Sequence, residues 1–211
     1  MASRVIAAVA ASVTVAALAL QVGLTIASHL ADGEGVLAAL WRLAGFFTNW
    51  GNAAAAVVAS AMALVPSSSL AGPRARLAAL AAIVLVGIVF AILLRENLTS
   101  ATGLQAVASR LLHDVTPVLF VLAWAASGHG TLRAVDAAWA LVLPAAYLAI
   151  VLVRGATEGF VPYWFLDLEG LGAAGYARNA ALLALAFAAL GLLIVAADRT
   201  LGRIAGHAPA R

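Results

Sequence analysis

The sequence contains no cysteine and no lysine, and it has few charged residues of either sign. The absence of cysteine excludes disulfide bonds, thiolate nucleophiles and cysteine-ligated metal or iron–sulfur sites. Only 10% of the 211 residues are charged, whereas 65% are hydrophobic. A water-soluble globule of this size does not have such a composition, so we predict an integral membrane protein.

The basic residues are all arginines, and they stand singly near the ends of apolar runs. A net charge of +3 without any basic cluster gives no reason to expect nucleic acid as a partner. Isolated arginines beside apolar runs instead indicate how the chain is oriented in a membrane.

Long apolar runs predict the spanning helices. A hydrocarbon core of roughly 30 Å requires about 20 apolar residues per helix. The runs cover residues 5–27, 43–65, 77–94, 113–127, 134–153 and 176–197. We therefore predict an all-α bundle of six transmembrane helices that forms a single domain over residues 1–211.

Two of these runs need comment. The first follows Arg4 as the apolar part of a signal peptide would, but it is longer than the usual limit of about 15 residues, so we expect it to remain as the first span. The fourth run is short for a span. The apolar stretch 104–112 before it either extends this helix or lies at the membrane interface.

Arginine placement favours both termini in the cytoplasm, because positive residues prefer that side. In this topology seven arginines are cytoplasmic and five lie on the opposite side. The cytoplasmic set is Arg4, Arg74, Arg76, Arg133, Arg199, Arg203 and Arg211, and the opposite set is Arg42, Arg95, Arg110, Arg154 and Arg178.

Three polar segments, far apart in sequence, then fall toward the leaflet opposite the termini. Thr48 lies about five residues inside the second span, which is roughly 8 Å below the interface. His113 begins the fourth run, and the segment 160–167 precedes the sixth. Ionisable residues inside a span usually face the bundle interior or a cavity, so His113 is a candidate functional residue.

Structural roles for the same residues stay open on spacing alone. A threonine in a spanning helix commonly bonds the carbonyl four residues earlier, as Thr48 would. Asn49 and Asn52 are of a type that joins neighbouring helices by hydrogen bonds. Asn52 shares a helix face with Thr48, so we expect it to point into the interior.

Three motifs carry a resemblance to a known family. They are Phe-Phe-Thr-Asn-Trp at 46–50, His-Asp-Val-Thr-Pro-Val-Leu-Phe at 113–120 and Tyr-Trp-Phe-Leu-Asp at 163–167. Together they resemble the bacterial branch of the androgen-induced, androgen-dependent family of six-helix membrane proteins. The resemblance implies an intramembrane threonine hydrolase that splits fatty acid esters of hydroxy fatty acids (FAHFAs) or similar esters. It also implies a membrane lipid as substrate and a place in the bacterial inner membrane.

By this resemblance Thr48 is the catalytic nucleophile and His113 is its base. A threonine hydroxyl is a weak nucleophile at neutral pH, and a histidine within about 3 Å can take its proton. We expect the two side chains to face each other within about 3–4 Å. The expected mechanism uses an acyl-threonine intermediate and needs no cofactor or metal.

The remaining candidates would assist this pair. Asn49 or Asn52, or backbone amides, would hold the oxyanion. Asp114 is adjacent to His113 and points about 100° away from it, so it is a poor candidate to orient the histidine. Asp167 or Tyr163 would do so if their loop folds inward. Arg154 would bind a carboxylate headgroup.

Other functions remain open from the sequence. His29 and His113 are both predicted near the same side, where two facing imidazoles could ligate a haem iron. A transporter is a further alternative. His129, in the Gly-rich segment 127–130, is expected to be solvated.

Overall fold

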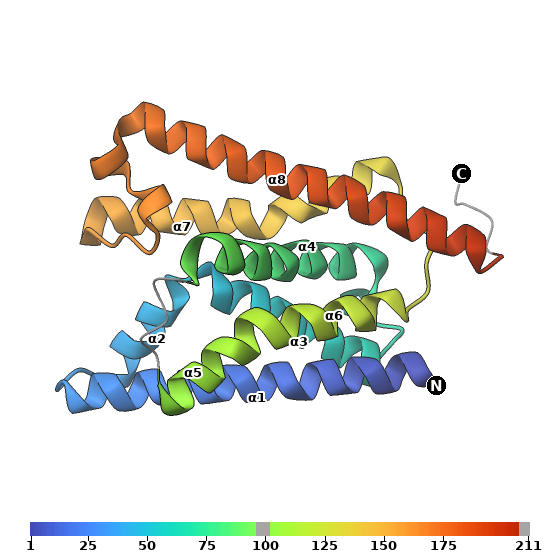
Figure 1. Ribbon diagram of the computed structural model, residues 1–211, viewed down its shortest axis with the longest axis horizontal. Helices are drawn as coiled ribbons and strands as arrows, with labels where there is room; N and C mark the ends of the chain where they lie inside the picture. Colours follow the sequence, from blue (N-terminus) through green and yellow to red (C-terminus); the bar gives the residue numbers. More distant parts are fainter. Residues whose placement is uncertain (96–101, 207–211) are drawn as a thin grey trace.

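The computed structural model describes residues 1–95 and 102–206. Every regular element within these two ranges is a helix (Figure 1). The α-helices are α1 (Ala2–Ala31), α2 (Val36–Ala44), α3 (Phe47–Leu64), α4 (Pro73–Val89), α5 (Gly103–Arg110), α6 (Thr116–Ala125), α7 (Val142–Glu158) and α8 (Leu168–Ile204). Short helical turns are η1 (Ser69–Ala71), η2 (Phe90–Leu94), η4 (Leu111–Val115), η5 (Ala134–Leu141) and η6 (Trp164–Leu166).

Five helical segments are long and apolar enough to cross a membrane. They are Ala2–Ala31, Pro73–Leu94, Gly103–Ala125, Ala134–Glu158 and Leu168–Ile204. These segments support an integral membrane protein. The second predicted span corresponds to α3, which has 18 residues but is less apolar, because Thr48, Asn49 and Asn52 occupy its first two turns.

Two helix boundaries differ from the predicted ones in ways that matter for the site. The apolar stretch 104–112 continues the fourth span, so this helix begins at Gly103 and His113 lies inside it rather than at its start. The second predicted span began at Leu43, but Leu43 belongs to α2. An extended residue, Phe46, caps α3. This break places Thr48 in the first turn of α3.

Helix α4 lies at the centre of the bundle, between α3 and α6 on one side and η5 and α8 on the other (Figure 1). Helix α1 packs along α3 and α6. Their contact faces are rich in alanine, including Ala7 and Ala10 of α1 and Ala55 and Ala59 of α3, all of which are buried. Small residues permit close backbone approach where lipid, not water, surrounds the bundle.

A glycine brings α4 close to the fourth span. A Cβ at Gly87 would lie 3.3 Å from the His113 carbonyl oxygen and equally close to the Pro117 ring. Gly87 therefore lets the backbone that carries His113 approach α4 more closely than a larger residue would allow.

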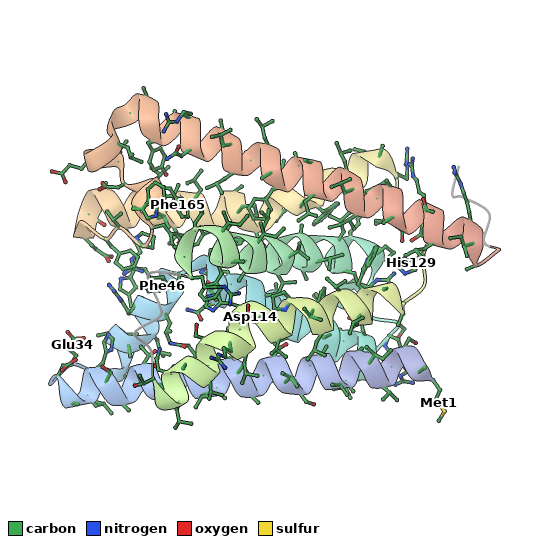
Figure 2. All side chains as sticks on the ribbon, in the orientation of Figure 1. Met1, Glu34, Phe46, Asp114, His129 and Phe165 are labelled. Carbon is green, nitrogen blue, oxygen red and sulfur yellow. The ribbon has the colours of Figure 1, made fainter. Side chains whose placement is uncertain are left out.

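Both ends of the chain's helical bundle can be located in the figures. The N-terminus of α1 and the C-terminal end of α8 lie at the same end (Figure 1). Phe46 and Phe165 lie toward the opposite end, and Asp114 lies between them and Met1 along the long axis (Figure 2).

At the end that holds the termini, the 127–133 connection is fixed to α8. The Asp198 carboxylate accepts hydrogen bonds from His129 Nδ1 at 3.1 Å and from the backbone N–H groups of Gly130 and Leu132, both at 3.0 Å. The His129 side chain is only 6% exposed, so the expectation of a solvated histidine was wrong. A buried carboxylate 66 to 69 residues later in the sequence thus holds this loop in place.

Candidate active site

Thr48 and His113 meet inside the bundle. The distance between Thr48 Oγ1 and His113 Nε2 is 3.2 Å, which is within hydrogen-bonding range. The first residue comes from the start of α3 and the second from η4, 65 residues later. The predicted pairing of these two side chains is therefore confirmed as geometry.

The other ring nitrogen of His113 determines which tautomer the ring adopts. Nδ1 lies 2.8 Å from the carbonyl oxygen of Ser109 and 3.4 Å from its hydroxyl. Because a carbonyl can only accept, Nδ1 carries the hydrogen and donates it to Ser109. Nε2 then presents its lone pair to the Thr48 hydroxyl, as a general base requires.

Neither predicted orienting group, Asp167 or Tyr163, bonds the Nδ1 of His113, and the Tyr163 oxygen instead accepts the backbone N–H of Phe47. Asp167 caps α8, where its Oδ1 accepts the Gly170 N–H at 2.9 Å. Asp114, which was not expected to orient the ring, forms an ion pair with Arg95. The orienting acceptor is instead a backbone carbonyl one turn earlier in the same helix, and it needs no acidic side chain.

Two π-helical turns, η2 and η4, meet at the His113 ring. Phe90, the first residue of η2, stacks on the imidazole with ring centroids 4.0 Å apart and planes 17° apart. His113 is the central residue of η4, which directly precedes α6 and its Pro117. Proline lacks an N–H for the carbonyl four residues earlier, and the wider turn accommodates this loss. Single π turns of this kind are frequent at functional sites.

Asn52 links the backbones behind the pair. Its side chain is fully buried, and its Nδ2 donates to the Thr48 carbonyl at 2.8 Å and to the Leu112 carbonyl at 3.2 Å. The prediction that it faces the interior is confirmed. Because one amide group contacts the residue before His113 and Thr48 itself, Asn52 fixes the spacing between α3 and η4.

The predicted oxyanion role of the two asparagines does not fit this arrangement. Both hydrogens of the Asn52 amide are directed at carbonyls. Asn49 Nδ2 donates to the Leu43 carbonyl at 2.7 Å and so closes the turn between α2 and α3. The Asn52 amide therefore has no hydrogen left for a substrate oxygen, and the Asn49 amide is held at the turn between the two helices.

Arg154 does not fit its predicted role as a carboxylate receptor either. The residue is 4% exposed, its Nε donates to Glu158 at 3.0 Å, and a terminal nitrogen donates to the Trp41 carbonyl at 2.9 Å. Its guanidinium also lies between two aromatic rings, 4.3 Å from the centroid of Trp41 and 4.0 Å from that of Phe160. Arg154 therefore holds α2 against α7.

Two tyrosine hydroxyls lie beside Thr48. Tyr163 accepts the backbone N–H of Phe47 at 3.1 Å, and Tyr147 donates to the Gly45 carbonyl at 2.8 Å. Burial raises the pKa of the Tyr163 phenol, so this hydroxyl keeps its hydrogen at neutral pH. A phenol oxygen can accept a hydrogen bond and still donate its own hydrogen, so Tyr163 keeps a donor beside Thr48.

A cavity of about 300 Å³ opens next to this cluster. Its polar lining residues are Thr48, Tyr147 and Tyr163, and the rest of its wall is apolar. That wall is formed mainly by the second half of α4, the start of α7, η6 and the middle of α8. The candidate nucleophile thus faces a space suited to a hydrocarbon chain.

The histidines proposed as a haem pair each have other partners. His29 lies at the end of α1, where its Nδ1 is 3.0 Å from the Thr25 carbonyl and its Nε2 is 3.4 Å from Glu34. Glu34 and Asp114, which adjoin the two histidines, are well separated along the bundle (Figure 2). Within residues 1–95 and 102–206, no group of three or more His, Asp or Glu side chains could hold a metal ion.

Sequence reasoning missed three residues that shape the site. Ser109 lies four residues before His113 on the predicted apolar stretch, so the i to i+4 spacing of a helix could have indicated that it contacts the imidazole. Phe90 and Tyr147 gave no comparable signal, because their role depends on the packing of separate helices.

No known family profile, curated protein or solved structure matches this chain.

Proposed function

We propose that this protein is an intramembrane hydrolase of fatty-acyl esters, with Thr48 as nucleophile and His113 as general base. It would form a bundle of six spans, α3 included, with both termini in the cytoplasm. The observation that carries the proposal is the 3.2 Å contact between the two side chains at the wall of an apolar cavity.

The acylation step follows from the ring's tautomer. As Thr48 Oγ1 attacks the ester carbonyl carbon, its proton passes to His113 Nε2, and the carbonyl oxygen becomes an oxyanion. The C–O bond to the alcohol then breaks, and the imidazolium returns the proton to the leaving oxygen. Throughout both transfers, the N–H at Nδ1 stays hydrogen-bonded to the Ser109 carbonyl oxygen, which keeps the ring aligned.

Deacylation reverses these roles with water. His113 takes a proton from a water molecule that attacks the acyl-threonine carbonyl. The imidazolium then protonates Thr48 Oγ1 as the acid leaves, and the free enzyme is restored. The net reaction is ester plus water to acid plus alcohol.

Tyr163 is the side chain best suited to stabilise the oxyanion. Its neutral hydroxyl lines the same cavity as Thr48, and its oxygen is held by the Phe47 N–H, so its hydrogen can be directed at the developing charge. Tyr163→Phe should lower kcat by roughly 10²- to 10³-fold with little change in KM. Tyr147→Phe is the matched control, since that hydroxyl donates to the Gly45 carbonyl and should affect the rate much less.

A fluorophosphonate probe tests the nucleophile directly. The purified protein in lipid nanodiscs should become labelled, and mass spectrometry should map the label to Thr48. Thr48→Ala should abolish labelling and His113→Ala should slow it strongly. Labelling of another residue, or labelling unaffected by Thr48→Ala, would refute the proposal.

A further inference from the structure

We infer that the ester taken by this site is electrically neutral along its whole length within the cavity, and that a free carboxylate on the substrate is disfavoured. The inference rests on the proposed function and narrows its substrate class. It would separate this protein from hydrolases whose substrates carry a fatty-acid carboxylate.

Among residues 1–95 and 102–206, the groups that line the cavity are all neutral. Beyond the three hydroxyls of Thr48, Tyr147 and Tyr163, its lining consists of aliphatic and aromatic side chains together with Pro144. A hydroxyl can solvate an ester oxygen, but it does not compensate the charge of a carboxylate.

The shape of the cavity fits an acyl chain lying along the helices. It is lined from Leu141 to Leu148 on one side and from Ala180 to Phe187 on the other, about 10 Å of helix in each case. Helices α7 and α8 diverge toward the end opposite the termini (Figure 1). The exposed residues Leu182 and Leu185 show that α8 also faces the surrounding lipid. We expect an apolar substrate to enter the cavity from the bilayer on this side.

Three of the five arginines predicted on this side of the membrane already have partners, while Arg178 of α8 hydrogen-bonds only the neighbouring Asn179 amide within the part of the chain that the structure describes. Arg154 is held by Glu158 and two aromatic rings, and Arg95 by Asp114. Arg42 lies over the rings of Phe46 and Phe160, at 5.3 and 5.2 Å from their centroids. Drawing one of these three to a substrate carboxylate would break contacts that join α2, α7 and the neighbouring loops.

A charge transferred into such an environment without a counter-ion loses far more solvation than it regains. A carboxylate-bearing ester can bind only if its charge stays outside the cavity, which restricts where its ester bond can lie. A neutral ester has no such restriction and can place its carbonyl carbon at Thr48 Oγ1.

The test compares cleavage of the internal ester bond in one fatty acid ester of a hydroxy fatty acid and in its own methyl ester. Because the methyl ester adds a second cleavable ester bond, the rate is measured as the initial release of the unsubstituted fatty acid that both compounds share. At pH 7.5 in nanodiscs, the methyl ester should be hydrolysed at least about tenfold more efficiently in kcat/KM, because the desolvation cost exceeds the free energy of one factor of ten. Non-cleavable ether analogues of the two compounds should protect Thr48 from the fluorophosphonate with the same preference.

Each outcome has a distinct meaning. Equal efficiency, or preference for the free acid, would overturn the inference while leaving the hydrolase proposal intact. If neither ester is hydrolysed and neither analogue protects Thr48, the proposed function itself fails and the inference with it.

A gain-of-function variant provides a second check. Leu94 lines the cavity near the end of η2 and is partly exposed, so a long side chain there can reach inward. Leu94→Arg should shift the preference toward the free acid by about tenfold or more, because it supplies the missing counter-charge. Leu94→Gln, similar in polarity but uncharged, should not. Unchanged selectivity in Leu94→Arg, with the protein folded, would contradict the role assigned to charge.

Discussion

The ring of Phe90 stacks face to face on the imidazole of His113, with centroids 4.0 Å apart. This contact fixes the plane of the ring, while the Ser109 carbonyl fixes its rotation within that plane. The base is thus held by one aromatic side chain and one backbone oxygen. Its alignment depends on the packing of α4 against the fourth span.

Phe90→Leu should therefore reduce activity more than stability. A leucine keeps an apolar contact but allows the imidazole to tilt, and we expect kcat/KM to fall by about tenfold. Phe120→Leu is the control, because Phe120 is equally buried but belongs to the main core. Rates and thermal unfolding of both variants should be measured in the same detergent. An equal loss of rate in the two would mean that Phe90 only supports folding.

Thr48→Ala and His113→Ala should each lower the rate of ester hydrolysis by about 10³-fold or more. The double variant should be little less active than either single variant. Nucleophile and base act as a unit, so the second loss removes nothing further. Thr48→Ser should retain part of the activity, since it keeps a hydroxyl at the same position. Parent-like hydrolysis by either folded alanine variant would end the hydrolase proposal.

The apolar runs were sufficient to predict the helical membrane fold, whereas the approach of Thr48 to His113 was expected from their similar depth together with the family resemblance. Apolar runs locate the helices, and polar residues inside them must avoid lipid, so they gather in the interior. The break at Gly45 and Phe46 was not predicted, because the apolar run continues through it. The partner of Arg154 is the Trp41 carbonyl, 113 residues away, and no local pattern indicates a contact of that range.

The contribution of Asn52 can be separated from that of Asn49. Asn52→Ala removes the link from α3 to the Leu112 carbonyl and should lower kcat by about 10- to 100-fold through misplacement of the pair. Asn49→Ala removes only the bond to the Leu43 carbonyl and should have a smaller effect on kcat. Single-turnover kinetics measure both. The assignment fails if Asn49→Ala is the more damaging of the two.

Asp198 should affect stability but not catalysis. Asp198→Ala leaves His129 Nδ1 and two backbone N–H groups without their acceptor, and hydrogen bonds to a charged group contribute about 1.5–3 kcal/mol. We expect the thermal midpoint, followed by tryptophan fluorescence, to fall by about 5–10 °C. Asp32→Ala, at an exposed position, should leave the midpoint nearly unchanged. Activity below the midpoint should match the parent in both variants.

The π turn at Leu111–Val115 also makes the site sensitive to chain length. Such a turn holds one more residue than an α-helical turn, so it offsets α5 from α6 by about 100° around the helix axis. Deleting a single residue there would restore a regular α-helix and rotate Ser109 away from the imidazole, or the imidazole away from Thr48. Homologous proteins that conserve this geometry would therefore accept changes in the side chains of the segment more readily than an insertion or deletion of one residue.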